Sequence, residues 1–132
     1  MKKKVGVRLL QIILSHESGD RITAAVLHWD GEHLRVASSL AGLVMLEPEE
    51  RDGFRVAILA IVGDAEKVAR RIEETPGPRP EMGLAEVFPV REGLGASLYW
   101  TPVSTLRTSD PAAHFEGLVR ELHLERCPQA AA

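Results

Sequence analysis

The chain has 132 residues, the size of one domain, and its 45% hydrophobic and 27% charged residues are typical of a globular protein and exclude a disordered one. The formal net charge of −3 argues against a nucleic-acid partner, and the single cysteine, Cys127, excludes internal disulfides and zinc sites built on paired cysteines. No apolar run reaches the roughly 18 residues of a membrane span, and no signal-peptide cleavage site follows the N-terminal lysines. We therefore expect a cytoplasmic protein without a membrane partner, forming one domain over residues 1–128 and a frayed tail over residues 129–132.

The N-terminal third predicts strands. In residues 5–14 the apolar Val5, Val7 and Leu9 alternate with other residue types, which is the pattern of a strand with one buried face. A polar segment over residues 15–20 follows, with the glycine and aspartate expected of a turn.

Two further alternating runs, residues 22–29 and 32–38, are separated by Asp30-Gly31. Asp-Gly between such runs is a strong signal of a β-hairpin, because both turn residues must take a positive φ. If the loop holds only these two residues, Leu27 lies opposite Leu34 and His28 lies opposite His33. One face of the hairpin is then apolar and is assigned to the core: Ala25, Leu27, Leu34 and Val36. The other face is expected to be wetter: His28, His33 and Arg35.

Residues 54–72 leave two interpretations open. As one helix, they place an apolar stripe at steps of three and four residues. As a strand, residues 54–62 end at Gly63, and Asp64 then caps a shorter helix. We favour a mostly helical segment, although Gly63 inside a helix costs about 1 kcal/mol relative to alanine. Both interpretations make residues 65–74 helical and residues 76–83 a loop.

The C-terminal third predicts two strands, residues 84–90 and 96–106, joined by residues 91–95, with Pro102 at an edge or bulge. A helix follows, with Asp110 as its N-cap and Pro111 in its first position. Its buried stripe is expected to be Phe115, Leu118, Val119 and Leu122, and Pro128 closes it. The predicted fold is therefore α+β: a mostly antiparallel sheet with an N-terminal β-hairpin region, a central helix and a C-terminal helix packed on the sheet.

The sequence contains no recognisable catalytic motif. A GxSxG motif, a Walker loop and an HExxH motif are all missing from the sequence, so we predict no catalytic residue and no cofactor. His28 and His33 are weak metal-ligand candidates, because opposed residues of a hairpin lie about 5 Å apart. A catalytic zinc needs three protein ligands and no third presents itself, so we predict no metal site.

Five residues are candidates for binding a partner. His16, Asp20 and Arg21 belong to the polar loop after the first strand, and loops held by a rigid scaffold often carry function. Tyr99 and Trp100 are neighbours on a predicted strand, so one of them points inward and the other is free to anchor a partner.

Two segments of the chain resemble a known family. SLYWTPV at residues 97–103, followed by TSDP at residues 108–111, resembles the Ser-Leu-x-Trp-Ser/Thr-Pro strand and the Thr-x-Asp-Pro helix opening that end the domain-of-unknown-function family numbered 3037. GDRITAAVL at residues 19–27 is similar to that family's Gly-Glu-x-x-Asn-x-Gly-Val strand, with Thr23 and Ala24-Ala25 in place of Asn and Val-Gly. The resemblance implies a small bacterial protein without an assigned activity, often encoded beside a HipA-type kinase of the toxin class. It therefore implies an accessory role associated with a toxin–antitoxin pair.

Three functional hypotheses follow. The first is a non-enzymatic accessory or protein-interaction module that partners a HipA-type kinase; a homodimer is left open. The second is a small metal-dependent hydrolase that uses the His28/His33 pair, which a cleft joining these histidines or His16 to Asp20 would favour. The third is a nucleic-acid-associated regulator, which an exposed basic stripe of Lys67, Arg70 and Arg71 would favour.

Overall fold

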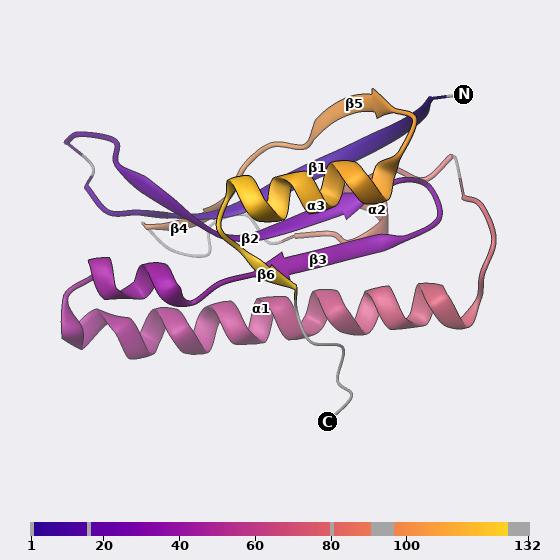
Figure 1. Cartoon of the computed structure of the whole chain (residues 1–132). Helices are drawn as coiled ribbons and strands as arrows, with labels where there is room; N and C mark the ends of the chain where they lie inside the picture. The colour runs from indigo at the N-terminus through magenta and orange to yellow at the C-terminus, as the bar shows by residue number, and fades with distance from the viewer. Residues whose placement is uncertain (1, 16, 80, 91–96, 127–132) are drawn as a thin grey trace.

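The computed structural model describes residues 2–15, 17–79, 81–90 and 97–126, and these form a six-stranded antiparallel sheet with helices on both faces. The strand order is β4-β1-β2-β3-β6, and β5 pairs with the part of β1 that β4 leaves free (Figure 1). The strands are β1 (Lys3–Ile13), β2 (Arg21–Trp29), β3 (Leu34–Ser38), β4 (Leu98–Trp100), β5 (Ser104–Thr108) and β6 (Glu125–Arg126). The helices are η1 (Ala41–Met45, a 3-10 helix), α1 (Pro48–Glu74), α2 (Leu84–Val87) and α3 (Pro111–Glu121). The predicted α+β class, with a central and a C-terminal helix on a mostly antiparallel sheet, is confirmed.

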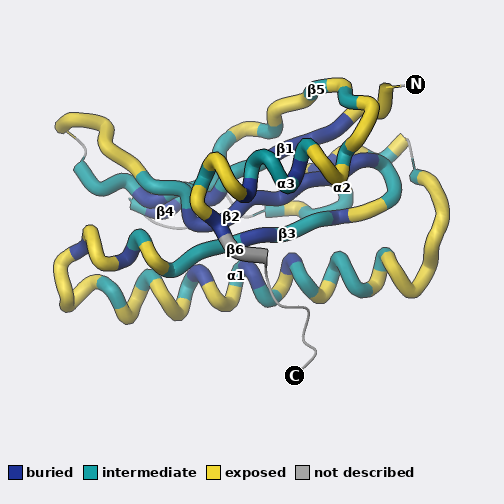
Figure 2. The backbone as a smooth tube through the Cα atoms, viewed as in Figure 1, coloured by how far each residue is buried: buried dark blue, intermediate teal, exposed yellow. Residues whose placement is uncertain are grey.

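Both faces of the sheet are apolar, and a different helix covers each one. Leu10 packs in a cluster with Ile58 and Val62 of α1. Val26 belongs to another cluster, with Phe115 of α3. Because successive strand residues point to opposite faces, α1 and α3 lie on opposite sides of the sheet. Figure 2 shows the buried positions gathered in the strands between the two helices.

Helix α1 is continuous, as the favoured interpretation of residues 54–72 predicted. It has 27 residues and begins at Pro48, whose missing N–H is not needed in the first turn. Gly53 and Gly63 lie within it, and a Cβ at either position would meet nothing within 4 Å. The intrinsic cost of a helical glycine is thus outweighed by burial of the opposite side of the helix.

The predicted hairpin is present, but its turn is centred one residue later than predicted. Asp30 N donates weakly to His33 O at 3.4 Å, so Gly31 and Glu32 occupy the centre, with Gly31 at φ 93°. Glycine in the first central position suits a type II′ turn. The pairing with Leu34 shifts by two residues as a result: Leu27 lies opposite Val36, Trp29 opposite Leu34, and His28 opposite Arg35.

Because the register shifts by an even number of residues, each residue stays on the face predicted for it. The second face, however, is not exposed to solvent as predicted. Helix α3 covers it, and His28 has 0% of its surface exposed. Only His33, at the turn, is well exposed there.

Two predicted strands near the C-terminus differ in the structure. The segment predicted as a strand over residues 84–90 instead contains the short helix α2 at Leu84–Val87, and at its start the Glu86 carboxylate accepts a long hydrogen bond of 3.5 Å from Gly83 N. The segment predicted as one strand over residues 96–106 is divided into β4 and β5, with Pro102 between them, as expected of a proline that cannot join a ladder. The predicted connection over residues 91–95 lies outside the described residues, as does residue 96.

Helix α3 begins as predicted. The Asp110 carboxylate accepts a hydrogen bond of 3.1 Å from Ala113 N, and Pro111 is the first helical residue. Phe115 and Val119 are buried, whereas Leu118 and Leu122 of the predicted stripe are half-buried. The helix ends at Glu121, before the predicted stop at Pro128, which lies with the tail outside the described residues. No described helix is both long enough and apolar enough to cross a membrane.

Candidate functional site

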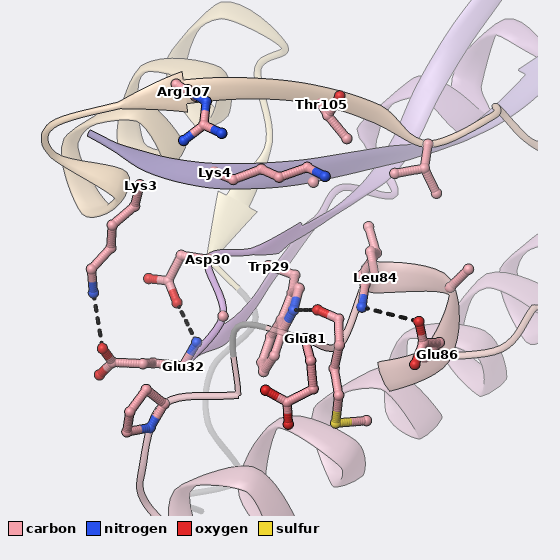
Figure 3. Close-up of a pocket in the computed structure, with 17 residues that line it drawn as sticks. Lys3, Lys4, Trp29, Asp30, Glu32, Glu81, Leu84, Glu86, Thr105 and Arg107 are labelled. Atoms are coloured by element: carbon pink, nitrogen blue, oxygen red, sulfur yellow. Dashed lines mark hydrogen bonds and ion pairs between the residues drawn. The ribbon is translucent and has the colours of Figure 1, made fainter. Parts of the chain in front are cut away.

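A groove of about 680 Å³ opens at the end of the sheet where β5 pairs with β1 (Figure 3). This volume lies within the range of ligand-binding pockets, roughly 300–1,000 Å³. The lining comes from three parts of the chain: strands β1 and β5, the β2–β3 turn, and the segment from Pro78 to Glu86 that contains the start of α2.

The floor of the groove is apolar and tightly packed. Trp29 and Leu84 are 3% and 2% exposed. The indole Nε1 of Trp29 donates a hydrogen bond of 2.8 Å to Met82 O, which ties the α2 segment to the sheet. Gly6 allows the close approach, since a Cβ there would lie 3.3 Å from the Leu84 Cβ and 3.5 Å from a Val103 methyl group. Packing therefore holds the floor in one position.

The walls of the groove carry opposite charges. Lys4 on β1 is paired directly with Arg107 on β5, and both side chains line the groove. Glu81 and Glu86 line the α2 side, across the groove from the two cations in Figure 3. Neither Lys4 nor Arg107 has an ion-pair partner among the described residues. The strand wall thus keeps two uncompensated positive charges.

One ion pair links β1 to the hairpin turn at the rim. Lys3 Nζ lies 2.9 Å from Glu32 Oε1, and this hydrogen bond raises the pKa of Lys3. Both side chains are well exposed, so the pair contributes little to stability. It does neutralise Lys3, which leaves Lys4 and Arg107 as the cations available to a ligand.

The turn itself is held by Asp30, whose side chain is 3% exposed. Its carboxylate accepts hydrogen bonds of 2.8 Å from the backbone N–H groups of Glu32 and His33 and lies 2.7 Å from Arg35 Nη1. Burial acts to raise the pKa of Asp30, but the hydrogen bonds from Arg35, His33 and Glu32 outweigh burial and lower the pKa to about 2. The Asp30 carboxylate is thus ionised at neutral pH, and its hydrogen bonds fix the hairpin rim of the groove.

His28 lies on the other face of the sheet, away from the groove. Its Nε2 is 3.1 Å from Nδ1 of His114 on α3, and its ring meets the edge of Phe115. Burial, together with the charge of Arg35 and the neighbouring His114, lowers the pKa of His28 to about 4. Its Nδ1 has no hydrogen-bond partner among the described residues. A neutral ring that donates from Nε2 to His114 leaves only an acceptor unpaired there, which costs less than burying a charge.

The predicted His28/His33 juxtaposition is wrong. The two-residue shift of the hairpin places Arg35 opposite His28, while His33 Nδ1 lies 3.7 Å from Asp30 Oδ2 at the turn. The described part of the chain contains no group of three or more His, Cys, Asp or Glu residues arranged to hold a metal ion. The second hypothesis therefore loses the pair of ligands on which it depended.

Among the predicted partner-binding residues, the structure brings Tyr99 and Arg21 together. The Tyr99 hydroxyl donates to Gln11 Oε1 at 2.7 Å and accepts from Arg21 Nη1 at 2.5 Å. The Arg21 guanidinium also lies 5.7 Å from the centroid of the Tyr99 ring. Gln11 Nε2 continues the network to Thr23 Oγ1 at 3.3 Å. This polar cluster joins β4, β1 and β2.

The other three candidates lie elsewhere. Trp100 points to the α1 side, where it is half-buried and meets the edge of Phe88. Asp20 is exposed in the turn after β1, where its carbonyl accepts from Leu14 N at 2.7 Å. His16 lies outside the described residues. Tyr99 and Trp100 point to opposite faces of the sheet, but both are half-buried and the Tyr99 hydroxyl is bonded within the chain.

The groove was not predicted from the sequence, because its charged residues come from strands that lie far apart in the chain. Lys4 was seen only as part of a terminal lysine run, and Arg107 was not singled out. The signal that could have identified them is the pairing of β1 with β5, which no local pattern contains. The basic stripe on α1 is present in part: Lys67 and Arg71 are exposed and Arg70 is half-buried. Three glutamates also lie in residues 66–74, so this segment carries no net positive charge.

No protein-family model, no curated protein and no solved structure matches this chain.

Proposed function

We propose that this chain is a non-enzymatic protein-interaction module that binds an extended segment of a partner protein along β5. The observation that carries the proposal is the edge of this strand. Within the described residues β5 pairs only with β1, and Ser104, Thr105 and Arg107 are exposed. An unpaired strand edge offers a row of N–H and C=O groups to a peptide that adds to the sheet.

The groove beside β5 supplies the selectivity that a bare edge lacks. Thr105 and Arg107 both line it, so alternate side chains of β5 face the groove. A strand added beside β5 would present alternate side chains to the same side. An acidic side chain opposite Arg107 would meet its guanidinium and the neighbouring Lys4 ammonium. An apolar side chain four positions away would lie over Val103 and Leu84.

A peptide-display experiment with the full chain as bait tests this proposal. We expect the selected peptides to share an acidic and an apolar residue four positions apart, and to perturb the backbone NMR signals of β5. The double variant Lys4→Glu/Arg107→Glu should bind a selected peptide at least tenfold more weakly, because both charges facing the ligand are reversed. Arg120→Glu, an exposed charge reversal on α3, is the matched control and should leave binding unchanged. Binding that survives the double variant would overturn the proposal.

The resemblance to family 3037 supports a HipA-type kinase as the protein that supplies the segment. The purified kinase should co-elute with the full chain in size-exclusion chromatography, and the Lys4→Glu/Arg107→Glu variant should not co-elute. Co-elution that the variant retains would assign the kinase to a different surface.

A further inference from the structure

We propose that two copies of this chain associate through the outer faces of α1, packed antiparallel about a two-fold axis. This surface lies on the side of α1 that faces away from the sheet and is separate from the β5 edge (Figure 1).

The outer face of α1 is apolar at its middle. Ile58, Val62 and Ala65 are buried against the sheet, but Val56 and Leu59 are 68% and 54% exposed. A helix advances 100° per residue, which places Val56 nearly opposite the buried stripe. Val56 and Leu59 lie three residues apart and are therefore neighbours on the helix surface, and contiguous exposed apolar residues are typical of an interaction site.

The residues beside this pair are small. Ala60 and Gly63 follow on the same stripe, and the space around Gly63 is open, with nothing within 4 Å of the position of a Cβ. Packing within the chain therefore gives no reason for glycine at this position, where alanine would favour the helix. A second helix that approaches closely would give that reason.

The charges on the outer face select the partner. Glu49 and Asp52 lie near its N-terminal end, whereas Lys67 and Arg70 lie near its C-terminal end. In an antiparallel pair centred between Leu59 and Ala60, Asp52 and Glu49 each face a cation of the second copy, whereas an in-register parallel pair would place like charges opposite each other.

In that register four oppositions along the stripe are complementary. Asp52 faces Lys67, Val56 faces Gly63 and Leu59 faces Ala60, with Glu49 opposite Arg70 at the ends. Two-fold symmetry makes each contact twice. The partner that fits the outer face of α1 is therefore the same face of a second copy of the chain. Asp52 already lies 3.6 Å from Arg55, but both side chains are largely exposed and this pair is weak.

Charge reversal provides a test that leaves the core of the chain untouched. Asp52→Lys places two lysines opposite each other in each half of the dimer, and Lys67→Asp places two aspartates opposite each other. Each should raise the dissociation constant by about tenfold or more, because every substitution acts twice. The double variant Asp52→Lys/Lys67→Asp restores opposite charges across the two-fold axis and should return the dissociation constant close to that of the natural chain.

Sedimentation equilibrium of the full chain over a wide concentration range measures these constants. Glu121→Lys, an exposed reversal on α3, is the matched control and should leave the constant unchanged. High salt should weaken the natural dimer, since its end contacts are ionic. A natural chain that is monomeric at every concentration would overturn the proposal. So would a dimer that neither single variant weakens, or one that the double variant fails to restore.

Discussion

The imidazole rings of His28 on β2 and His114 on α3 face each other between the sheet and the helix, with 3.1 Å between His28 Nε2 and His114 Nδ1. His28 is completely buried and its pKa is lowered to about 4. The folded chain therefore holds His28 as a neutral ring, and charging this ring opposes the docking of α3 on this face of the sheet.

The first prediction concerns pH. Above the ordinary histidine pKa of 6.5, His28 is neutral in both the folded and the unfolded chain. Between pH 6.5 and about 4 the unfolded chain binds a proton that the folded chain excludes, so the free energy of unfolding should fall as pH decreases, by up to about 1.4 kcal/mol per unit. Urea denaturation over this range measures the slope. His28→Leu should flatten it, and a slope that persists in this variant would show that another group is responsible.

The second prediction concerns Asp30. Asp30→Ala removes the acceptor for two backbone N–H groups and for Arg35, and should destabilise the fold by about 2–3 kcal/mol. Asp30→Asn keeps a neutral acceptor for the backbone and should cost less. Denaturant titration at neutral pH compares the two variants. Equal losses would mean that a neutral acceptor does not replace the carboxylate, so that the charge of Asp30 carries the whole stabilisation.

The third prediction compares two glycines. Gly31 has a φ of 93°, so Gly31→Ala should destabilise the hairpin by about 1–2 kcal/mol. Gly117 lies within α3 with open space around it, so Gly117→Ala should stabilise the chain by about 0.5–1 kcal/mol. Thermal melts of the two variants should therefore shift in opposite directions, and shifts of the same sign would contradict the turn geometry.

The fourth prediction concerns α3. Asp110→Ala removes the cap hydrogen bond to Ala113 N and should cost about 1 kcal/mol. Phe115→Ala should cost roughly 3–5 kcal/mol, because this ring is 4% exposed and contacts His28. Urea unfolding distinguishes the two effects, and negligible losses in both variants would mean that α3 is not docked on the sheet.

The fifth prediction separates the two neighbouring aromatic residues. Tyr99→Phe loses the hydrogen bonds to Gln11 and Arg21 and should cost about 1 kcal/mol. Trp100→Ala opens a space beside Phe88 on the α1 side and should cost more. The comparison is made by chemical denaturation, and a larger loss for Tyr99→Phe would contradict the inward position of Trp100.

Local sequence patterns correctly predicted the helices α1 and α3, because the signals for both lie within a few residues of one another. The Asp110-Pro111 pair starts α3, and the apolar stripe that includes Ile58 and Val62 forms α1, because a cap and a 3.6-residue period act within a few turns. The hairpin was located correctly, but its register was not. The Asp30 carboxylate accepts hydrogen bonds from Glu32 N and His33 N, which places Gly31 and Glu32 at the centre of the turn. The alternation of apolar residues does not reveal this contact.

Two features could not be predicted from local patterns: the burial of His28 and the presence of the groove. Both depend on contacts between distant parts of the chain. His28 is buried because α3, more than eighty residues later, packs over it. The groove exists because β5 returns to β1 and brings Arg107 beside Lys4. Alternation along a single strand shows which residues share a face, but it does not show what covers that face.

The position of β1 inside the sheet has a consequence during synthesis. This strand leaves the ribosome before the strands that flank it, yet one of its edges pairs with β4 and β5. Leu10 therefore cannot pair with Trp100, nor Val5 with Leu106, until the C-terminal third has been synthesised. Until residues 98–108 emerge, a long apolar strand has an unpaired edge, which is a template for aggregation. A chain that stops before β4 would therefore be a substrate for chaperones and proteases, and the cellular level of this protein should depend on completion of its last third.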